Sequence, residues 1–145
     1  MSYDSLPDDV RDRPLTDPAL QADVIDLILG LETRHGGGVA LMVCDQHDRG
    51  VQPVVVSDIP DTARATGLRE LLDLLLPAVG EEGGSVLVGR GRRRSLVPTD
   101  RDREWHQCAI DACGRHGVRL LGFYLATPQG VEAMPEPLAP TPRRG

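Results

Sequence analysis

The sequence predicts a single domain of the α/β (α+β) class, built on a mixed β-sheet. Apolar residues recur at helical spacing in three segments, and short β-branched apolar runs lie between them. The order of elements is α-β-β-α-β-α-β, in which a hairpin is followed by strands that are reached through helical crossovers. We expect a flexible N-terminal arm over residues 1–15, the domain over 16–134 and a disordered proline-rich tail over 135–145.

The first helix is expected in the run PALQADVIDLILGLETRH, residues 18–35. Thr16 suits the N-cap position, and Asp17 and Pro18 suit a first helical turn. The apolar side chains that share one face are Leu20, Val24, Leu27, Ile28 and Leu31. Three consecutive glycines at 36–38 end this helix.

Two apolar runs, VALMVCD (39–45) and VQPVVVS (51–57), predict an antiparallel hairpin because a short polar loop joins them. Pro53 lies inside the second run, which indicates an edge strand or a bulge, since proline cannot donate to a neighbouring strand.

The remaining elements alternate between helix and strand. A leucine-rich helix over 68–79 precedes the short strand SVLVG (85–89). A helix over 100–117, with Thr99 as its N-cap, then leads to a last strand over 118–127.

Composition argues against a nucleic-acid partner. The net charge is −6 at pH 7, whereas nucleic-acid binding depends on a basic surface. The aromatic residues are Tyr3, Trp105, Phe123 and Tyr124, too few to form a platform on which bases stack.

The chain also shows no signal for export or membrane insertion. No apolar run approaches the ~20 residues of a membrane-spanning helix, and the acidic first 15 residues lack the apolar centre of a signal peptide. Cys44, Cys108 and Cys113 are an odd number of thiols, which we expect to be reduced. Arginine is preferred over lysine, as in high-GC genomes. We therefore expect a cytoplasmic bacterial protein.

The densest positive charge lies in GRGRRRSLVPTDRD, residues 89–102. A strand, a Gly-x-Gly turn and a helix N-terminus are elements of phosphate-binding sites. However, no Lys-Ser/Thr pair follows the glycines, and Asp100 and Asp102 would repel an anion at the helix start. The segment is therefore expected to be a charged surface loop rather than a nucleotide site.

Two cysteine–histidine pairs could form a zinc site. Cys44 with His47 and Cys113 with His116 form C-x2-H pairs that could supply four zinc ligands, although each cysteine lies in an apolar run typical of the core.

Nucleophilic catalysis would need Cys108 with His106, or Ser95 with a histidine. Two residues that are two apart on a helix point to different sides, and Ser95 has no nucleophile-elbow context. Asp45, Asp48 and Asp58 flank the hairpin as ordinary turn residues.

From about residue 39 to 134, the chain resembles the JAMM/MPN metalloprotease-like family, in particular its RadC-like branch. The segment PTDRD (98–102) is similar to the family motif P-S-x-x-D, with Thr99 in place of serine and Asp102 in the place of a metal ligand. The same spacing puts Gly89 and Gly91 at the two zinc-binding histidines of H-x-H-P-S-G. Downstream, HGVRLLGFYLAT (116–127) parallels the family strand G-I-x-L-x-D-H, with glycine and phenylalanine in the Asp-His places.

The departures from the family imply a metal-free, catalytically inactive relative. Glycine offers no side-chain ligand, and Asp102 alone cannot hold zinc. The hairpin strand 51–57 also lacks the glutamate that would act as general base, because Gln52 and Ser57 are its only polar side chains.

These observations predict a non-catalytic binding or scaffolding module that needs no cofactor. Arg90, Arg92, Arg93 and Arg94 are the expected contact surface for a protein partner, because guanidinium groups bind carboxylates in a bidentate manner. Self-association through the strand near Pro53, or through the leucine-rich helix over 68–79, is a further expectation. The alternative is a hydrolase, or a nucleotide- or phosphate-binding enzyme, that uses the same four arginines.

Overall fold

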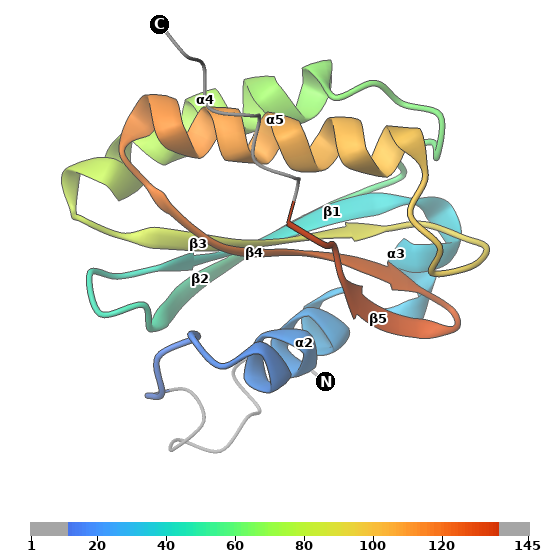
Figure 1. Cartoon of the computed structure of the whole chain (residues 1–145), viewed down its shortest axis with the longest axis horizontal. Coiled ribbons are helices and arrows are strands. Elements are labelled where there is room, and N and C mark those ends of the chain that lie inside the picture. Colours follow the sequence, from blue (N-terminus) through green and yellow to red (C-terminus); the bar gives the residue numbers. More distant parts are fainter. Residues whose placement is uncertain (1–11, 137–145) are drawn as a thin grey trace, which may run out of the picture.

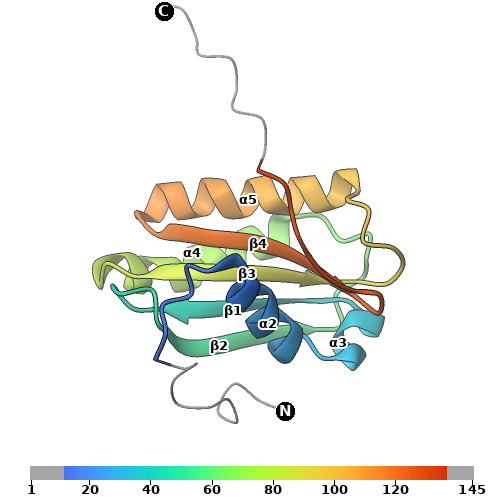
Figure 2. The same cartoon turned by 60° about the horizontal axis from the view of Figure 1, so that its bottom comes forward.

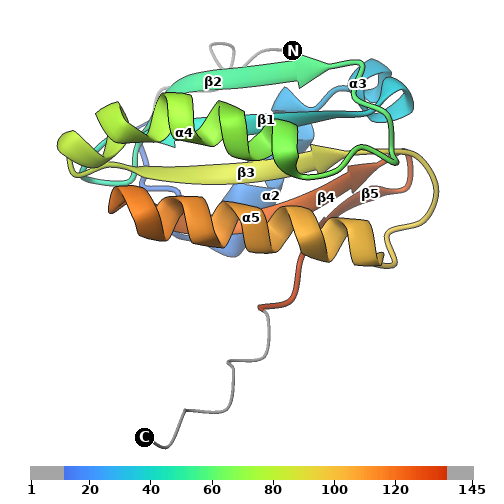
Figure 3. The ribbon, with the colours of Figure 1, turned by 90° about the horizontal axis from the view of Figure 1, so that it is seen from above.

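The computed structural model describes residues 12–136, which form a five-stranded sheet between two layers of helices (Figure 1). Helices α4 and α5 cover one face of the sheet, and α2 and α3 lie on the other (Figures 1 and 3). The helices are α2 (Pro18–Ile28), α3 (Leu31–Gly36), α4 (Thr66–Glu81) and α5 (Asp100–His116). The strands are β1 (Gly38–Cys44), β2 (Gly50–Ser57), β3 (Ser85–Gly91), β4 (Arg119–Thr127) and β5 (Gly130–Ala133).

The strand order is β2-β1-β3-β4-β5, and the predicted mixed sheet is confirmed. Strand β1 is antiparallel to both β2 and β3, whereas β3 and β4 run parallel and are joined through α5. The sheet therefore combines a hairpin of β1 and β2 with a helical crossover from β3 to β4, as the order of elements predicts. The C-terminal ends of β3 and β4 consequently lie together at one end of the sheet, beside the start of α5 (Figure 3).

The predicted hairpin of β1 and β2 is confirmed, and β2 is an edge strand, as its proline indicates. Pro53 pairs in register with Met42, and the register shifts between Val43 and Cys44. The Gln52 side-chain amide donates to the Pro53 carbonyl oxygen at 2.9 Å, so residue 53 offers no backbone N–H and its carbonyl oxygen already accepts one hydrogen bond.

The first predicted helix is wrong in two details. Its N-cap is Asp17 rather than Thr16, because the Asp17 carboxylate accepts the backbone N–H of Ala19. The helix also breaks after Ile28, and a separate short helix, α3, begins at Leu31.

A buried arginine accounts for this break. Arg34 folds back from α3 and donates to the carbonyl oxygens of Asp26, Leu29 and Thr127. A continuous helix would have paired the carbonyl groups of Asp26 and Leu29 internally; here they accept hydrogen bonds from Arg34 instead. The break lets Leu29, which is fully buried, pack beneath the sheet.

Helices α4 and α5 lie where the sequence predicts them, to within two residues, whereas β3 continues two residues beyond its predicted end at Gly89. Thr99 is the N-cap of α5, as expected, and forms a capping box with Asp102. The left-handed Gly117 ends the helix. Pro77 is tolerated inside α4 on its exposed side.

Strand β5 was not predicted. It forms a short hairpin with β4, and the chain after it crosses β4 towards α5 (Figure 2). There the Met134 backbone N–H donates to the Phe123 carbonyl oxygen at 2.8 Å.

The sheet separates two hydrophobic cores. One joins α4 and α5 to the sheet and contains Trp105, Leu72 and Phe123. The other lies against α2 and contains Ile25, Leu29 and Tyr124. Every residue of β3 is buried, because this central strand has helices on both faces.

The outer segments agree only partly with the predicted domain bounds. Leu15 is fully buried in the α2 core and its N–H donates to the Asp48 carbonyl oxygen, so the packed domain includes at least one residue of the predicted arm. Residues 1–11 and 137–145 lie outside the described part of the chain, as does most of the predicted tail. Within residues 12–136, no helix has the length and apolar character needed to cross a membrane.

Candidate functional site: a buried arginine clamp at the end of β3

The end of β3 directs its side chains to two different faces of the sheet. Successive residues of a strand alternate between faces. A Cβ atom added at Gly89 would lie 2.9–3.0 Å from side-chain atoms of Ile25 and Leu29, on the α2 side. Gly91 faces the same way, whereas Arg90 and Arg92 face the N-terminus of α5.

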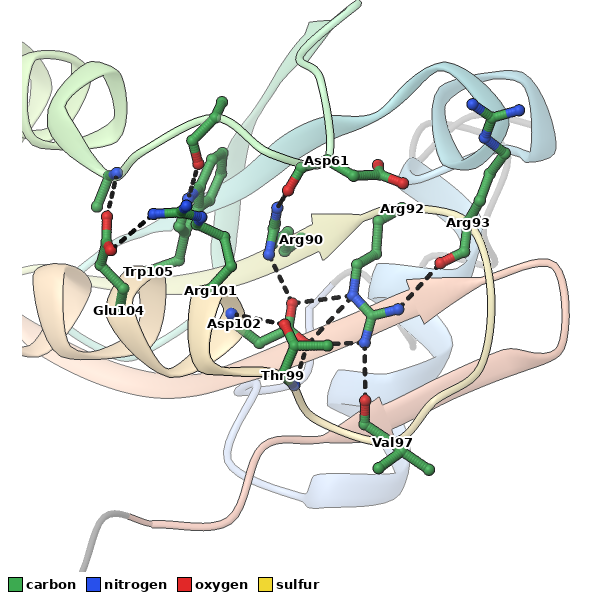
Figure 4. Close-up of polar contacts among 12 residues, drawn as sticks. Asp61, Arg90, Arg92, Arg93, Val97, Thr99, Arg101, Asp102, Glu104 and Trp105 are labelled. Carbon is green, nitrogen blue, oxygen red and sulfur yellow. Dashed lines mark hydrogen bonds and ion pairs between the residues drawn. The ribbon is translucent and has the colours of Figure 1, made fainter.

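Arg90 and Arg92 converge on the carboxylate of Asp102 (Figure 4). The Arg90 Nη1 atom lies 2.6 Å from Asp102 Oδ1, and Arg92 Nη2 lies 2.7 Å from Asp102 Oδ2. Arg92 Nε donates to Oδ1 as well, at 2.9 Å, so Arg92 binds the carboxylate in a bidentate manner through one edge of its guanidinium group. The Arg90 and Asp102 side chains are almost completely buried, and Arg92 is 5% exposed.

The cluster contains two positive charges and one negative charge, and backbone carbonyl groups compensate for the excess. Arg90 donates to the Asp61 carbonyl oxygen at 2.6 Å, and its guanidinium lies 4.5 Å from the centre of the Trp105 ring. Arg92 donates to the carbonyl oxygens of three residues of the following loop, namely Arg93, Ser95 and Val97. Arg92 therefore holds the loop closed around its own guanidinium.

Asp102 also begins α5. Its Oδ2 atom accepts the Thr99 N–H at 2.8 Å, and the Thr99 hydroxyl accepts the Asp102 N–H at 3.1 Å. Burial raises the pKa of the Asp102 carboxyl, but hydrogen bonds from Arg92 and Thr99 and the charges of both arginines outweigh it and hold this pKa below its usual value. The carboxylate is therefore ionised and accepts hydrogen bonds on both oxygens.

Arg93 and Arg94 differ from their neighbours because both are exposed. Within the described chain, neither guanidinium has a hydrogen-bond or ion-pair partner, and Figure 4 shows Arg93 extending away from Asp102. Arg94 has a φ of +77°, in the left-handed region that a bulky side chain seldom adopts. The hydrogen bonds of Arg92 to residues on both sides stabilise this conformation.

The structure corrects the sequence-based description of this segment. Four arginines on one exposed loop were expected, but Arg90 and Arg92 are buried and paired, so only Arg93 and Arg94 present guanidinium groups to a ligand. Gly89 and Gly91 do not lie beside Asp102, so side chains at these positions would not meet its carboxylate. Asp102 does accept helix-start N–H groups, as the sequence indicated.

The site does not fit the zinc ion that active members of the resembled metalloprotease-like family bind. Both Asp102 oxygens are engaged by guanidinium groups, whose positive charge opposes a cation at the same place. Gln52 and Ser57 lie on the edge strand β2, where Gln52 binds its neighbouring carbonyl group and Ser57 Oγ lies 3.3 Å from Thr33 Oγ1.

The two C-x2-H pairs do not form one site. Cys44 belongs to the α2 core and Cys113 to the core on the opposite face of the sheet. Burial raises the pKa of both thiols to about 12, so they remain protonated at neutral pH. His116 Nε2 lies 2.8 Å from Asp73 Oδ1, and no group of three or more metal-binding side chains occurs within residues 12–136.

Cys108 and His106 also point apart, as their spacing on the helix predicts. Cys108 lies against the Ala65 carbonyl group at the start of α4, whereas His106 stacks on Phe123 of β4. Ser95 is a loop residue whose hydroxyl accepts the Val97 N–H.

Of the aspartates around the hairpin, Asp45 has the expected turn role, whereas Asp48 bonds to side chains of other strands. Asp45 accepts N–H groups within the β1–β2 turn, and Asp48 binds the Ser85 hydroxyl and Arg119.

One signal in the sequence could have shown the clamp. Arg90 and Arg92 have the same parity along β3 as Val86 and Val88, which face the α4–α5 core. A strand that continues beyond Gly89 therefore turns both arginines inwards. Comparison with known protein families and with curated proteins finds no match to this chain.

Proposed function

We propose that this protein is a non-catalytic binding module of JAMM/MPN-like architecture, in a bacterial cytoplasm, that binds an acidic segment of a partner protein through Arg93 and Arg94. The observation that carries the proposal is the clamp beneath these residues. Arg92 binds Asp102 and three loop carbonyl groups, while the two exposed guanidiniums beside it have no partner within the described chain.

A held loop favours binding for a physical reason. Ordering a flexible loop on association costs free energy, and a loop that is already closed avoids that cost. Strain at Arg94 is consistent with a functional role, because strained residues persist where surrounding contacts hold them. Two adjacent guanidinium groups are suited to carboxylates, which they bind in a bidentate manner.

The family resemblance enters this proposal through the start of α5. The motif spacing puts the two metal-binding histidines at Gly89 and Gly91, which face α2 and α3 rather than Asp102, so these two positions do not support the resemblance. The capping box of Thr99 and Asp102 at the start of α5 supports the match to P-S-x-x-D.

The proposal can be tested by calorimetric titration with a synthetic hexaglutamate peptide. The double variant Arg93→Ala/Arg94→Ala should bind at least about tenfold more weakly, because charge-assisted hydrogen bonds are lost. The matched control is Arg13→Ala/Arg49→Ala, which removes the same charge from two other exposed arginines. Equal weakening in both variants, or no binding of the peptide to the wild type, would contradict the proposal.

Titration with inorganic phosphate or ATP distinguishes the enzyme alternative from this proposal. That alternative needs an anionic small molecule at the arginines, but Arg90 and Arg92 are already paired and Thr99 and Asp102 occupy the start of α5. Tight binding of inorganic phosphate or ATP that is lost in Arg93→Ala/Arg94→Ala would favour the alternative.

A further inference from the structure

His106 is a buried histidine whose ring has no hydrogen-bond partner among residues 12–136. It lies on the face of α5 that packs against β4, where its ring stacks on Phe123 with centroids 5.0 Å apart and an interplanar angle of 27°. The residue is 4% exposed, and neither ring nitrogen forms a hydrogen bond with any other residue of the described chain. Buried polar groups in proteins almost always have partners, so an unpaired imidazole needs an explanation.

The imidazole lies between two hollows of the surface. One has a volume of about 250 Å³ and extends along the C-terminal half of α5 to Val118 and Gly122. The other has a volume of about 580 Å³ and lies between the first half of α5 and residues 134–136. His106 and Glu136 line both hollows, so the two spaces meet at these side chains. The volume of the larger hollow is in the range of small-molecule sites.

The charges around the larger hollow leave one carboxylate unpaired. Asp100 is bonded by Arg103, and Glu104 is bonded by Arg64 and Arg101. The Gln107 amide donates to Asp111. Glu136, in contrast, has no hydrogen-bond or ion-pair partner within the described residues.

His106 adds a neutral polar group to this wall. Burial lowers its pKa, although the negative charge of Glu136 opposes the shift. At neutral pH the ring therefore has one N–H donor and one free acceptor nitrogen. An acceptor nitrogen and an unpaired carboxylate together favour a ligand that has N–H donors and a positive charge.

We propose that the hollow at His106 and Glu136, hereafter the His106 hollow, binds a small organic cation of the alkylammonium or alkylguanidinium class. An N–H group of the ligand donates to the free ring nitrogen of His106, and its positive charge lies near the Glu136 carboxylate. The alkyl part lies against Pro98, Met134 and Pro135, which line the same space. This site is independent of Arg93 and Arg94.

The test is a titration of the full chain with butylguanidinium and butylammonium, followed by long-range proton–nitrogen NMR spectra of the imidazoles. The signals of His106 are those that disappear in His106→Phe, which retains a ring on Phe123. Both cations should shift these signals in a saturable way. Neutral butyramide should bind more weakly than either cation, and butyrate should not bind.

Two variants locate the site. His106→Phe should weaken binding at least about tenfold, because the acceptor for the ligand N–H is lost. Glu136→Gln should weaken it about two- to fivefold, the range of an exposed ion pair. The matched control is Glu132→Gln, an exposed carboxylate of β5 outside the hollow, which should bind like the wild type. Affinity for the cations can be followed in each variant by calorimetry.

The proposal is overturned if neither cation shifts the His106 signals, or if butyrate binds as tightly as the cations. It is overturned equally if His106→Phe retains the wild-type affinity, or if Glu132→Gln weakens binding as much as Glu136→Gln.

Discussion

Asp102 connects the end of β3 to the start of α5 through one carboxylate. It receives Arg90 and Arg92 from the end of β3 and the N–H of Thr99 from the start of α5. A buried charge that loses its partner is strongly destabilising, typically by about 3–5 kcal/mol. Here the loss would leave two buried guanidinium groups without their counter-ion.

We therefore expect Asp102→Asn to lower the free energy of unfolding by about 3–5 kcal/mol at pH 7, measured by urea denaturation. The matched control is Asp100→Asn in the same helical turn, whose side chain is fully exposed and pairs only with Arg103. That variant should lose less than about 1 kcal/mol. Similar losses in both variants would show that the clamp does not stabilise the fold.

The same residue predicts a dependence on pH. The pKa of Asp102 is lower in the folded protein than in the unfolded chain, so its stabilisation is complete above the unfolded value of about 3.9 and is lost as the pH falls towards the folded value. Urea denaturation between pH 6 and pH 2.5 should therefore show a loss of stability below about pH 4 in the wild type. Asp102→Asn should lack this part of the loss, and parallel pH profiles of the two proteins would contradict the assignment.

At the scale of elements, the backbones of α4 and α5 lie in contact at Gly80. A Cβ atom there would overlap the carbonyl oxygen of His116 at the end of α5. Arg115 and His116 also bind Asp73 of α4, so the two helices are connected along the same side. The glycine is required by the close approach of the two backbones.

We expect Gly80→Ala to destabilise the protein by about 1–3 kcal/mol, because the helices must move apart. Gly114→Ala in α5 provides the comparison, since a Cβ atom at Gly114 meets no atom within 4 Å. That change should stabilise the helix by up to about 1 kcal/mol. Thermal denaturation of both variants measures the difference, and equal melting temperatures would contradict the predicted contact.

At the scale of the whole molecule, the sheet ends in an exposed apolar strand. Val51 of β2 is 58% exposed and Val55 is 42% exposed. Such an edge can pair with another chain unless its backbone groups are blocked. Pro53 lacks an N–H group, and Gln52 occupies the Pro53 carbonyl oxygen, so the middle of the edge is protected.

We expect Pro53→Val to increase self-association, because it restores a backbone donor to a flat apolar edge. Sedimentation velocity over a range of concentrations should show association at lower concentration than in the wild type. Pro128→Val makes the same change in the exposed turn between β4 and β5 and should behave like the wild type. No difference between the two variants would show that Pro53 does not protect the edge.

Local patterns predicted most of the elements, for physical reasons. The leucines of α4 and the apolar stripe of α5 repeat at helical spacing, and the valines of β1 and β2 flank a short polar loop. These signals depend on neighbours in the sequence. Strand β5 was missed because Gly130–Ala133 is short and half-exposed, and its pairing with β4 supplies its stability.

Local sequence patterns predicted much less of the candidate sites than of the elements. The sequence determined the alternation of Arg90 and Arg92 along β3 and the capping box at Thr99, because both follow from the spacing of residues along one segment. Only the tertiary structure decided that these arginines are buried, since their counter-ion reaches them when α5 packs across the end of β3. The tertiary structure likewise decided that Arg93 and Arg94 remain exposed, and that His106 and Glu136 line the same hollow. Charge pairs and hollows form between segments that are distant in the chain, and the spacing of residues along one segment does not contain that information.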